Sequence, residues 1–477
     1  MGTLIRNGRV IDPASGKDGI YDILVEDGMI AGVDASIPKG DNDIIDAAGC
    51  FVMPGLVDLH VHFREPGFEY KETIKTGSMA AAHGGVTTVF PMPNTKPVID
   101  SVDMYDKVQT IIDRDAVVNV HQVASVTLRQ QGETPVDVAA LKKAGCIAIS
   151  EDGKSVMNSQ VYREAMKAAA AEDVLVMAHC EDKNLVNGGA LNEGVASRRY
   201  HVNGITNAVE DVIVARDILL SKETGCRLHL CHCSTADSVK LIKAAKDEGL
   251  KVTGGVCPHH FMLCDEDIIE DNADYKMNPP LRSRADMEAV REGLRNGTMD
   301  VISTDHAPHS AEEKAKPIGA APFGITGIET SLCLTYTGLV LTGILTPMQM
   351  VEKMTLNDHA SCAVPGEVCK ERLAVKLALL RQEVQHDKAG QVPDGLIEER
   401  RVEILQLAVF DQTHAKEAGR HAAMGFPVEE VAPAADGLPE QQTDAGQVQK
   451  GQDLELPNTG IADYSIPDPA RPDTAVF

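Results

Sequence analysis

Between Met53 and about Asn357, near-continuous apolar runs alternate with helix-like segments. There are eight apolar runs: Val57–Phe63, Thr87–Met92, Val117–Val126, Cys146–Ser150, Val174–Cys180, Leu228–Cys233, Lys251–Cys257 and Asp300–Asp305. The helix-like segments between them include Lys71–His83, Asn158–Ala171, Ala208–Leu220, Ser234–Asp247 and Ala285–Arg295. Strands that are apolar throughout and alternate with helices indicate a parallel sheet with both faces covered. Eight such repeats predict an α/β fold, a (β/α)₈ TIM-like barrel rather than an open sheet.

Different patterns flank this region. The first fifty residues contain short predicted strands separated by turns, at Thr3–Ile11, Asp22–Glu26, Met29–Val33 and Asp43–Asp46. We therefore divide the chain into N-terminal strands of a small β-sandwich (1–52), a barrel (53–357) and an atypical tail (358–477). In the tail we predict helices at Leu373–Gln382 and Glu398–Leu407, and beyond Ala432 a disordered segment without an apolar period.

Composition limits the partners. The net charge of −26 over 477 residues disfavours a nucleic acid partner, because the surface repels phosphate. The most apolar stretch, Ser331–Leu345, is too short to span a bilayer, so we expect no membrane partner. The 11 cysteines have no framework spacing and no secretory segment precedes them, which predicts reduced thiols in the cytoplasm.

Histidines and aspartates stand where five of the predicted strands end: His60, His62, Asp152, His179, His232 and Asp305. The carboxyl ends of barrel strands meet on one face, where barrel enzymes keep their active sites. Alternate residues of a strand point the same way, so both imidazoles of the His-x-His pair can reach one metal. Four histidines and two carboxylates on one face predict a site for divalent cations, zinc first.

Each of these residues also has an ordinary structural interpretation. A histidine in an apolar strand is usually a hydrogen-bonded core residue, and an aspartate after a strand is usually a helix cap. Scattered core residues would fall at either end of the strands, whereas these six fall at the same end. Their shared placement therefore favours the metal site.

Arg64 supplies a cation that the acidic surface otherwise lacks. A guanidinium can bind a carboxylate through two parallel hydrogen bonds. Without the neighbouring histidines, Arg64 would be interpreted as a surface ion pair, for example with Glu65. Asn94 and Asn278 can donate hydrogen bonds to a substrate, although each alone is more typical of a turn.

The motifs around these positions resemble those of the dihydroorotase family, in the type I bacterial branch of the amidohydrolase superfamily. The two long motifs are Asp58–Pro66 (DLHVHFREP) and Ser303–His309 (STDHAPH), the latter with Ser303 where Gly or Ala is usual. Shorter matches are Met92–Thr95, Glu151–Gly153, Ala178–Glu181, Cys231–Thr235, Pro258–His260, Asn278–Arg282 and Phe323–Glu329. The resemblance runs from the first barrel strand to about Asn357.

This resemblance implies an enzyme that interconverts N-carbamoyl-L-aspartate and dihydroorotate in de novo pyrimidine (UMP) biosynthesis. It implies two zinc ions per subunit, bridged by Asp152 and a hydroxide. His60 and His62 would bind one ion, and His179 and His232 the other. Asp305 would bind the first ion and act as the catalytic acid and base. The implied substrate contacts are His62, Arg64, Asn94, Asn278, His309, Phe323 and Gly324. The resemblance also implies a homodimer, and it leaves association with aspartate transcarbamoylase open.

Two alternatives stay open. Hydantoinases and allantoinases usually bridge their metals with a carboxylated lysine where this chain has Asp152, and Lys154 would take that place if the register shifted by two residues. A catalytically dead partner of aspartate transcarbamoylase would lack the metal histidines, all of which are present here.

The tail departs from the family pattern. Asp358-His359 follows Asn357, where the family has Pro-Ala and then strands that complete the N-terminal sandwich. We interpret the segment beyond Asn357 as a replaced or frame-shifted tail. The N-terminal strands are then expected to lack partners and to present unpaired edges.

Overall fold

The structure, a computed structural model, describes residues 2–355, 357 and 407–411. Its central part has parallel strands: β6 (Leu56–Val61), β7 (Val86–Pro91), β8 (Asn119–Val120), β9 (Ala124–Ser125), β10 (Ala148–Ser150), β11 (Leu175–Ala178), β14 (Leu228–Leu230), β15 (Val252–Val256) and β16 (Val301–Ile302). They form two sheets with the strand orders β6-β7-β8 and β9-β10-β11-β14-β15-β16. The predicted parallel α/β alternation is confirmed.

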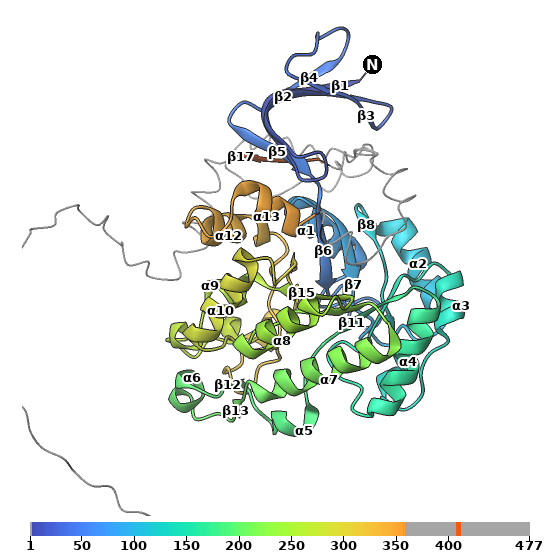
Figure 1. Ribbon diagram of the computed structural model, residues 1–477, viewed down its shortest axis with the longest axis vertical. Helices are drawn as coiled ribbons and strands as arrows, with labels where there is room; N and C mark the ends of the chain where they lie inside the picture. Colours follow the sequence, from blue (N-terminus) through green and yellow to red (C-terminus); the bar gives the residue numbers. More distant parts are fainter. Residues whose placement is uncertain (1, 356, 358–406, 412–477) are drawn as a thin grey trace, which may run out of the picture. The chain divides into compact units, whose positions relative to one another are not determined.

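Helices lie around these strands (Figure 1). The longer ones are α1 (Ile74–His83), α2 (Val102–Asp115), α3 (Val138–Lys143), α4 (Ser159–Ala171), α7 (Ala208–Thr224), α8 (Ala236–Asp247), α10 (Arg284–Arg295) and α13 (Pro347–Lys353). Shorter elements are α5 (Lys183–Val186), α6 (Val195–Arg199), α9 (Pro258–Met262), α11 (Ala311–Lys314), α12 (Ser331–Thr335) and the strand pair β12 (Leu191–Asn192) and β13 (Gly204–Ile205). Every residue of β6 and β7 is buried, as expected for strands covered on both faces. Within the described ranges, none of the helices has the length and apolarity needed to cross a membrane.

The two parallel sheets approach each other at both edges. On one side, only three residues separate β8 from β9. These residues interrupt the predicted run Val117–Val126. Among them, the buried Gln122 side chain donates to the carbonyls of Pro91 and Val123. On the other side Val61 forms a parallel bridge to His306, and His62 N donates to His306 O at 2.8 Å. The end of β6 thus lies beside the segment that follows β16.

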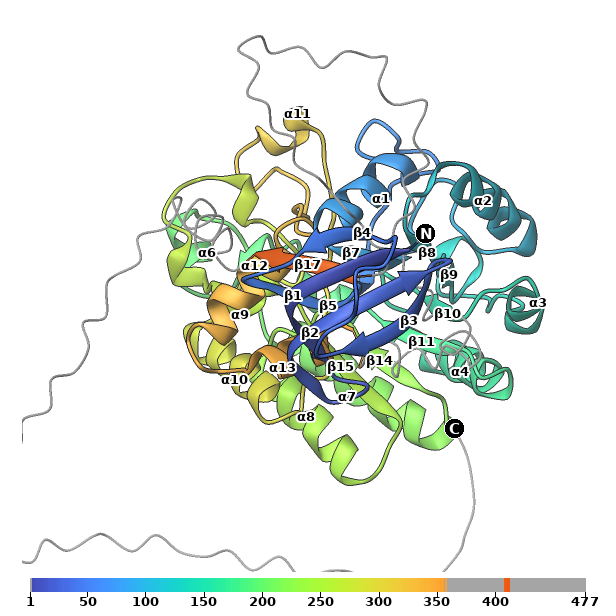
Figure 2. The ribbon, with the colours of Figure 1, turned by 90° about the horizontal axis from the view of Figure 1, so that it is seen from above.

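The N-terminal residues form a mixed six-stranded sheet of β17-β5-β1-β2-β3, with β4 paired to β1 (Figure 2). Its strands are β1 (Thr3–Asp12), β2 (Lys17–Glu26), β3 (Met29–Asp34), β4 (Asp43–Asp46), β5 (Cys50–Pro54) and β17 (Leu407–Asp411). The first part of β1 pairs with β4 and its second part with β5, on either side of an irregularity between Ile5 and Gly8. The strands are therefore connected by hydrogen bonds into one sheet, and the small β-sandwich stays a prediction.

The expectation that the N-terminal strands lack partners is wrong for β5. β17 pairs with it antiparallel from Leu407↔Pro54 to Asp411↔Cys50. The sequence Leu-Ala-Val-Phe at 407–410 is a short apolar run of the kind that pairs with an open strand edge. The predicted helix Leu373–Gln382 lies outside the described residues, as does Glu398–Leu407 except for Leu407, which belongs to β17.

Candidate active site

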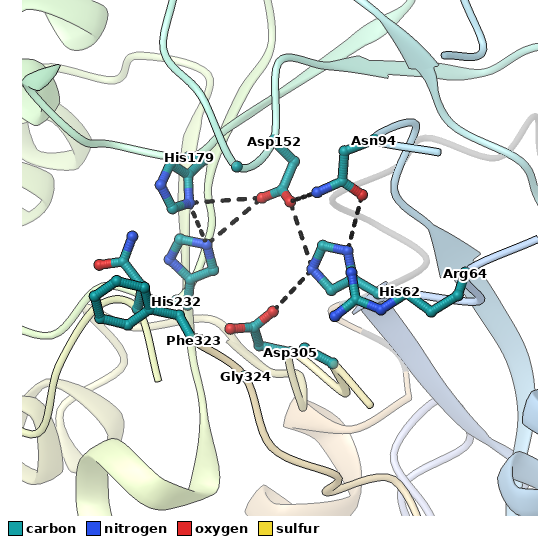
Figure 3. Close-up of a pocket in the computed structure, with 12 residues that line it drawn as sticks. His62, Arg64, Asn94, Asp152, His179, His232, Asp305, Phe323 and Gly324 are labelled. Carbon is teal, nitrogen blue, oxygen red and sulfur yellow. Dashed lines mark hydrogen bonds and ion pairs between the residues drawn. The ribbon is translucent and has the colours of Figure 1, made fainter. Parts of the chain in front are cut away.

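The six predicted metal ligands lie together at the carboxyl ends of the parallel strands. His60 belongs to β6 and His62 follows it, while the other four come after β10, β11, β14 and β16. Because neighbouring strands are parallel, these ends share one side of the sheet. Figure 3 shows the side chains of His62, Asp152, His179, His232 and Asp305 around a common centre.

Asp152 lies at the centre of this group. Its Oδ1 is 3.1 Å from His60 Nε2, 3.6 Å from His179 Nδ1 and 3.8 Å from His232 Nε2. Its Oδ2 is 3.4 Å from His62 Nε2. One carboxylate therefore faces all four histidines, so it can bridge two cations.

Asp305 approaches the same histidines from the end of β16. Its Oδ1 lies 3.1 Å from His62 Nε2 and 3.5 Å from His60 Nε2. On the opposite side of the group, His179 Nδ1 and His232 Nε2 are 3.0 Å apart. The donor atoms thus fall into two sets that share the Asp152 carboxylate.

Two buried atoms that face each other in this group, His60 Nε2 and Asp152 Oδ1, make no hydrogen bond within the described residues. Buried polar atoms are nearly always hydrogen-bonded, so these atoms fit a cation between them. Two sets have donor atoms within 4.8 Å of one another: His60, His62 and Asp305, and His60, Asp152 and His232. Nitrogen and carboxylate donors in sets of three suit zinc and similar divalent ions.

The imidazoles keep both carboxylates ionised. Burial alone would raise the pKa of Asp152, but the charge on His60 and the close approach of the His232 and His60 rings hold that pKa well below its ordinary value. Burial likewise opposes ionisation of Asp305, and the hydrogen bond from His62 with the nearby histidine charges lowers its pKa. Both groups can therefore offer charged oxygen atoms to a cation at neutral pH.

The backbone is strained where two of the ligands stand. His232 has φ 35° and Asp305 has φ 51°, which are left-handed values that cost about 1–3 kcal/mol in residues other than glycine. Asp58 supports the second of these turns by accepting hydrogen bonds from His60 N, Thr304 N and Thr304 Oγ1 at 3.1, 3.0 and 2.5 Å. The buried Asp58 carboxylate thus ties the end of β6 to the segment that carries Asp305.

A cavity of about 190 Å³ opens beside the donor group. Its walls contain five of the ligands, all but His60, together with the predicted substrate residues Arg64, Asn94, Asn278, Phe323 and Gly324. Gly324 has φ 128°, and a Cβ there would lie 2.7 Å from Ala307 O, so this wall requires glycine. Arg64 and the predicted metal site thus face the same cavity.

Asn94 lines this cavity, whereas His309 lies behind it, next to Arg64. Asn94 Oδ1 lies 3.0 Å from His62 Nδ1, and its Nδ2 donates to Asp152 Oδ2 at 3.2 Å, so Asn94 orients two ligands. His309 does not line the cavity; its Nε2 is 2.8 Å from Phe323 O and 3.4 Å from Arg64 Nη2. Burial and the charges of Arg64 and a neighbouring lysine lower the pKa of His309 to about 4, so its ring is neutral at pH 7.

Lys154 stays outside the donor group. Its Nζ donates to Gln130 O at 3.3 Å, while Asp152 occupies the centre. Between them, Gly153 has φ 69°, a turn that separates the directions of its two neighbours. The register shift that would place a lysine between the metals is not seen.

Two residues near the site were given no role from the sequence. Lys71 Nζ lies 3.1 Å from His309 Nδ1 and 3.0 Å from Glu313 Oε1. Glu181 Oε2 lies 3.6 Å from His179 Nε2 and accepts a hydrogen bond from Asn278 Nδ2. The sequence indicated Glu181 only through its place in the motif Ala178–Glu181 and gave no signal for Lys71, because the contacts of Glu181 with Asn278 and of Lys71 with His309 join residues distant in sequence.

A third group of possible donors, Cys257, His259 and His260, lies at the start of α9. His260 Nε2 is 2.9 Å from Pro279 O, so this ring anchors the loop that carries Asn278. Burial lowers the pKa of both histidines, which leaves them neutral. We interpret this group as support for the wall of the cavity.

Comparison with known proteins identifies relatives of this chain. Residues 49–238 match the family model described as "Dihydro-orotase-like". The chain is 49% identical over 367 residues to the dihydroorotase of Geobacillus kaustophilus (strain HTA426), covering 76% of this chain and 85% of that protein. It is 46% identical over 389 residues to the dihydroorotase of Staphylococcus aureus (strain Mu50 / ATCC 700699), covering 81% of this chain and 91% of that protein.

Among solved structures, the chain is similar to L-hydantoinase (dihydropyrimidinase) from Arthrobacter aurescens. The TM-score is 0.69 at 26% identity, covering 76% of this chain and 83% of that chain. The structural likeness indicates a cyclic amidohydrolase, and the higher identity to the curated relatives selects among them. The chain belongs to the dihydroorotase family.

Proposed function

We propose that this chain catalyses the dihydroorotase reaction, the reversible cyclisation of N-carbamoyl-L-aspartate to dihydroorotate, in pyrimidine biosynthesis. One observation carries the proposal: four histidines and two aspartates converge beside a cavity that also contains the Arg64 guanidinium. A hydrolytic metal centre next to a carboxylate-binding cation fits a cyclic amide that bears a carboxylate. Hydantoinases share the centre, but Asp152 stands in the place of their usual bridging lysine.

The six side chains are assigned to two zinc ions per subunit. His60, His62 and Asp305 would hold one ion, His179 and His232 the other, and Asp152 would bridge them. Zinc held by these residues would supply a nucleophilic hydroxide at neutral pH, because zinc lowers the pKa of water from about 16 towards 7, and it would supply positive charge near the developing oxyanion.

Asp305 is proposed as the catalytic residue that carries the proton. Its carboxylate lines the cavity and lies 3.1 Å from His62 Nε2, so it is within reach of the proton of the attacking nucleophile. As the ring amide opens, Asp305 returns that proton to the leaving ring nitrogen. In the direction of cyclisation, the same carboxylate removes a proton from the carbamoyl nitrogen.

The remaining assigned residues position the substrate. Arg64 binds the carboxylate with two hydrogen bonds, and Asn94 and His309 assist it. Asn278 and the backbone of Phe323 and Gly324 contact the ring, and His62 contributes at the metal edge. Arg64 Nε donates to Pro308 O at 3.1 Å and Nη2 lies 3.4 Å from His309 Nε2, so Nη1 and the second hydrogen of Nη2 remain for the substrate.

We also propose that the two parallel sheets close as a (β/α)₈ barrel over residues 53–357, preceded by the strand region 1–52 and followed by the tail 358–477. The contact of Val61 with His306 and the short connection between β8 and β9 support closure. A cytoplasmic location, a homodimer and an association with aspartate transcarbamoylase stay predictions.

The test is metal analysis of purified protein together with assays on dihydroorotate, hydantoin and allantoin. We expect about two zinc ions per chain and activity on dihydroorotate. Activity on hydantoin or allantoin alone would overturn the substrate assignment. Protein that binds no metal and acts on none of the three would favour the alternative of a catalytically dead scaffold.

A further inference from the structure

We propose that Glu181 is a positioning residue whose single carboxylate oxygen fixes both the metal-facing ring of His179 and the cavity-facing amide of Asn278. The inference about Asn278 rests on the proposed function, whereas the inference about His179 requires only that the site binds a metal. Glu181 itself does not line the cavity, so it acts through these two neighbours.

The His179 ring stands between the donor group and Glu181. Its Nδ1 faces the group, 3.6 Å from Asp152 Oδ1, and its Nε2 lies 3.6 Å from Glu181 Oε2. A neutral imidazole that binds a cation through Nδ1 must carry its proton on Nε2. That proton then points towards the Glu181 carboxylate. Histidine ligands commonly have such a carboxylate behind them, which orients the ring and increases its basicity.

Backbone hydrogen bonds to Ser155 hold His179 and Glu181 in place relative to each other. Ser155 Oγ donates to His179 O at 2.8 Å and accepts a hydrogen bond from Glu181 N at 3.1 Å. One buried hydroxyl thus clamps both ends of this three-residue segment. Within the described part of the chain, His179 is the only ion-pair partner of the Glu181 carboxylate.

The same Oε2 accepts a hydrogen bond from Asn278 Nδ2. This contact fixes which end of the Asn278 amide points towards Glu181, because a carboxylate can accept a hydrogen bond but not donate one. The Oδ1 atom of Asn278 makes no hydrogen bond to a described residue and remains available as an acceptor. An acceptor on the cavity wall fits a ring N–H of the substrate, so Glu181 would select for cyclic ureides that present one.

The test compares Glu181→Gln with the matched control Asp182→Asn in the full chain. Asp182 caps α5 by accepting hydrogen bonds from Asn184 N and Leu185 N, and among the described residues its side chain makes no hydrogen bond or ion pair with His179. Zinc content is measured after equilibration in graded zinc–chelator buffers. We expect E181Q to bind one of its two zinc ions about 10- to 100-fold more weakly, as for other carboxylates behind ligand histidines, and D182N to match the unmodified chain.

Steady-state kinetics on dihydroorotate at saturating zinc test the second contact. We expect E181Q to raise KM several-fold with a smaller change in kcat, and Asn278→Ala to remove most of that effect in the double variant. Glu181→Asp, which keeps the charge, should recover part of the zinc affinity. Wild-type zinc affinity in E181Q, or an equal loss in D182N, would overturn the proposal for His179. A KM effect that persists unchanged in the N278A background would overturn it for Asn278.

Two further measurements distinguish failure of the proposed function from failure of the proposed role of Glu181. If the unmodified chain is inactive on dihydroorotate, the proposed function fails, while the zinc titration still decides the role of Glu181 behind His179. If E181Q folds poorly, its melting temperature falls in excess zinc as well. In that case the zinc titration is carried out on E181D and on E181A instead. The proposal is refuted if E181D binds zinc with wild-type affinity and a folded E181A also keeps both ions.

Discussion

Replacing Asp305 with Asn tests the proposed proton carrier while changing the shape of the site very little. The Asp305 Oδ1 atom is one of several donors around His62 and His60, at 3.1 and 3.5 Å, so the amide should leave most of the zinc bound. The amide cannot accept and return a proton. General acid–base catalysis contributes about 10²- to 10⁴-fold, which corresponds to about 3–5 kcal/mol of the activation free energy. We therefore expect kcat on dihydroorotate to fall by about that factor.

Asp300→Asn is the matched control for this variant. Asp300 precedes β16 at the opposite end from Asp305, where it accepts hydrogen bonds from Gly254 N at 2.9 Å and Lys246 Nζ at 2.6 Å. D300N should lower thermal stability slightly and leave kcat within about twofold of the unmodified chain. The assay is the initial rate of dihydroorotate hydrolysis with zinc content measured on the same samples. Near-normal turnover in D305N with zinc bound would show that the proton is carried by another group.

Four other outcomes follow from the geometry. Arg64→Lys should raise KM for dihydroorotate about 10- to 100-fold with a smaller change in kcat, because an ammonium cannot bind a carboxylate through two parallel hydrogen bonds; an unchanged KM would contradict this in steady-state kinetics. Lys154→Ala should keep both zinc content and activity, since Lys154 Nζ contacts Gln130 O and not the donor group, and loss of metal would restore the lysine-bridge alternative. Dialysis against a chelator should lower the melting temperature reversibly, because it leaves the buried Asp152 and Asp305 carboxylates without a cation; an unchanged melting curve would count against metal binding. Burial raises the pKa of Asp217 to about 6 although Arg216 opposes this, so its contribution to stability is present below about pH 4 and lost as the pH rises through about 6. Because asparagine mimics the protonated carboxyl, the free energy of unfolding of Asp217→Asn in chemical denaturation should differ least from that of the unmodified chain near pH 4 and most above pH 6, and a pH-independent difference would contradict the assignment.

The parts of the site that could be predicted from the sequence are those fixed by a strand end. His60 and His62 are two residues apart on an extended segment, and His179 and His232 follow apolar runs that became β11 and β14. The alternation of a strand and the shared direction of parallel strands were sufficient to bring these rings together. Element boundaries shifted by only a few residues, as for α4, which begins at Ser159 where a helix was predicted from Asn158.

The remaining features depend on contacts across long stretches of sequence. Lys71 meets His309 across 238 positions and Glu181 meets Asn278 across 97, so no local pattern indicates either contact. The break between β8 and β9 follows from the Gln122 side chain bonding inwards to Pro91 O, although its neighbours read as a continuous apolar run. β17 was missed for a similar reason, since its partner β5 lies more than three hundred residues earlier in the chain.

Backbone geometry, as much as composition, decides that an aspartate and not a lysine lies at the centre of the donor group. Glu151, Asp152 and Lys154 all follow β10, and each could reach towards a site at the strand end. Glu151 instead accepts hydrogen bonds from Val126 N and Thr127 N at 3.1 and 3.0 Å, which turns its carboxylate towards β9. The left-handed turn at Gly153 then directs Lys154 to Gln130, so Asp152 alone remains at the centre. A side chain as short as aspartate can bridge two cations only if the four imidazoles lie this close to it, and the distances of 3.1–3.8 Å satisfy that condition.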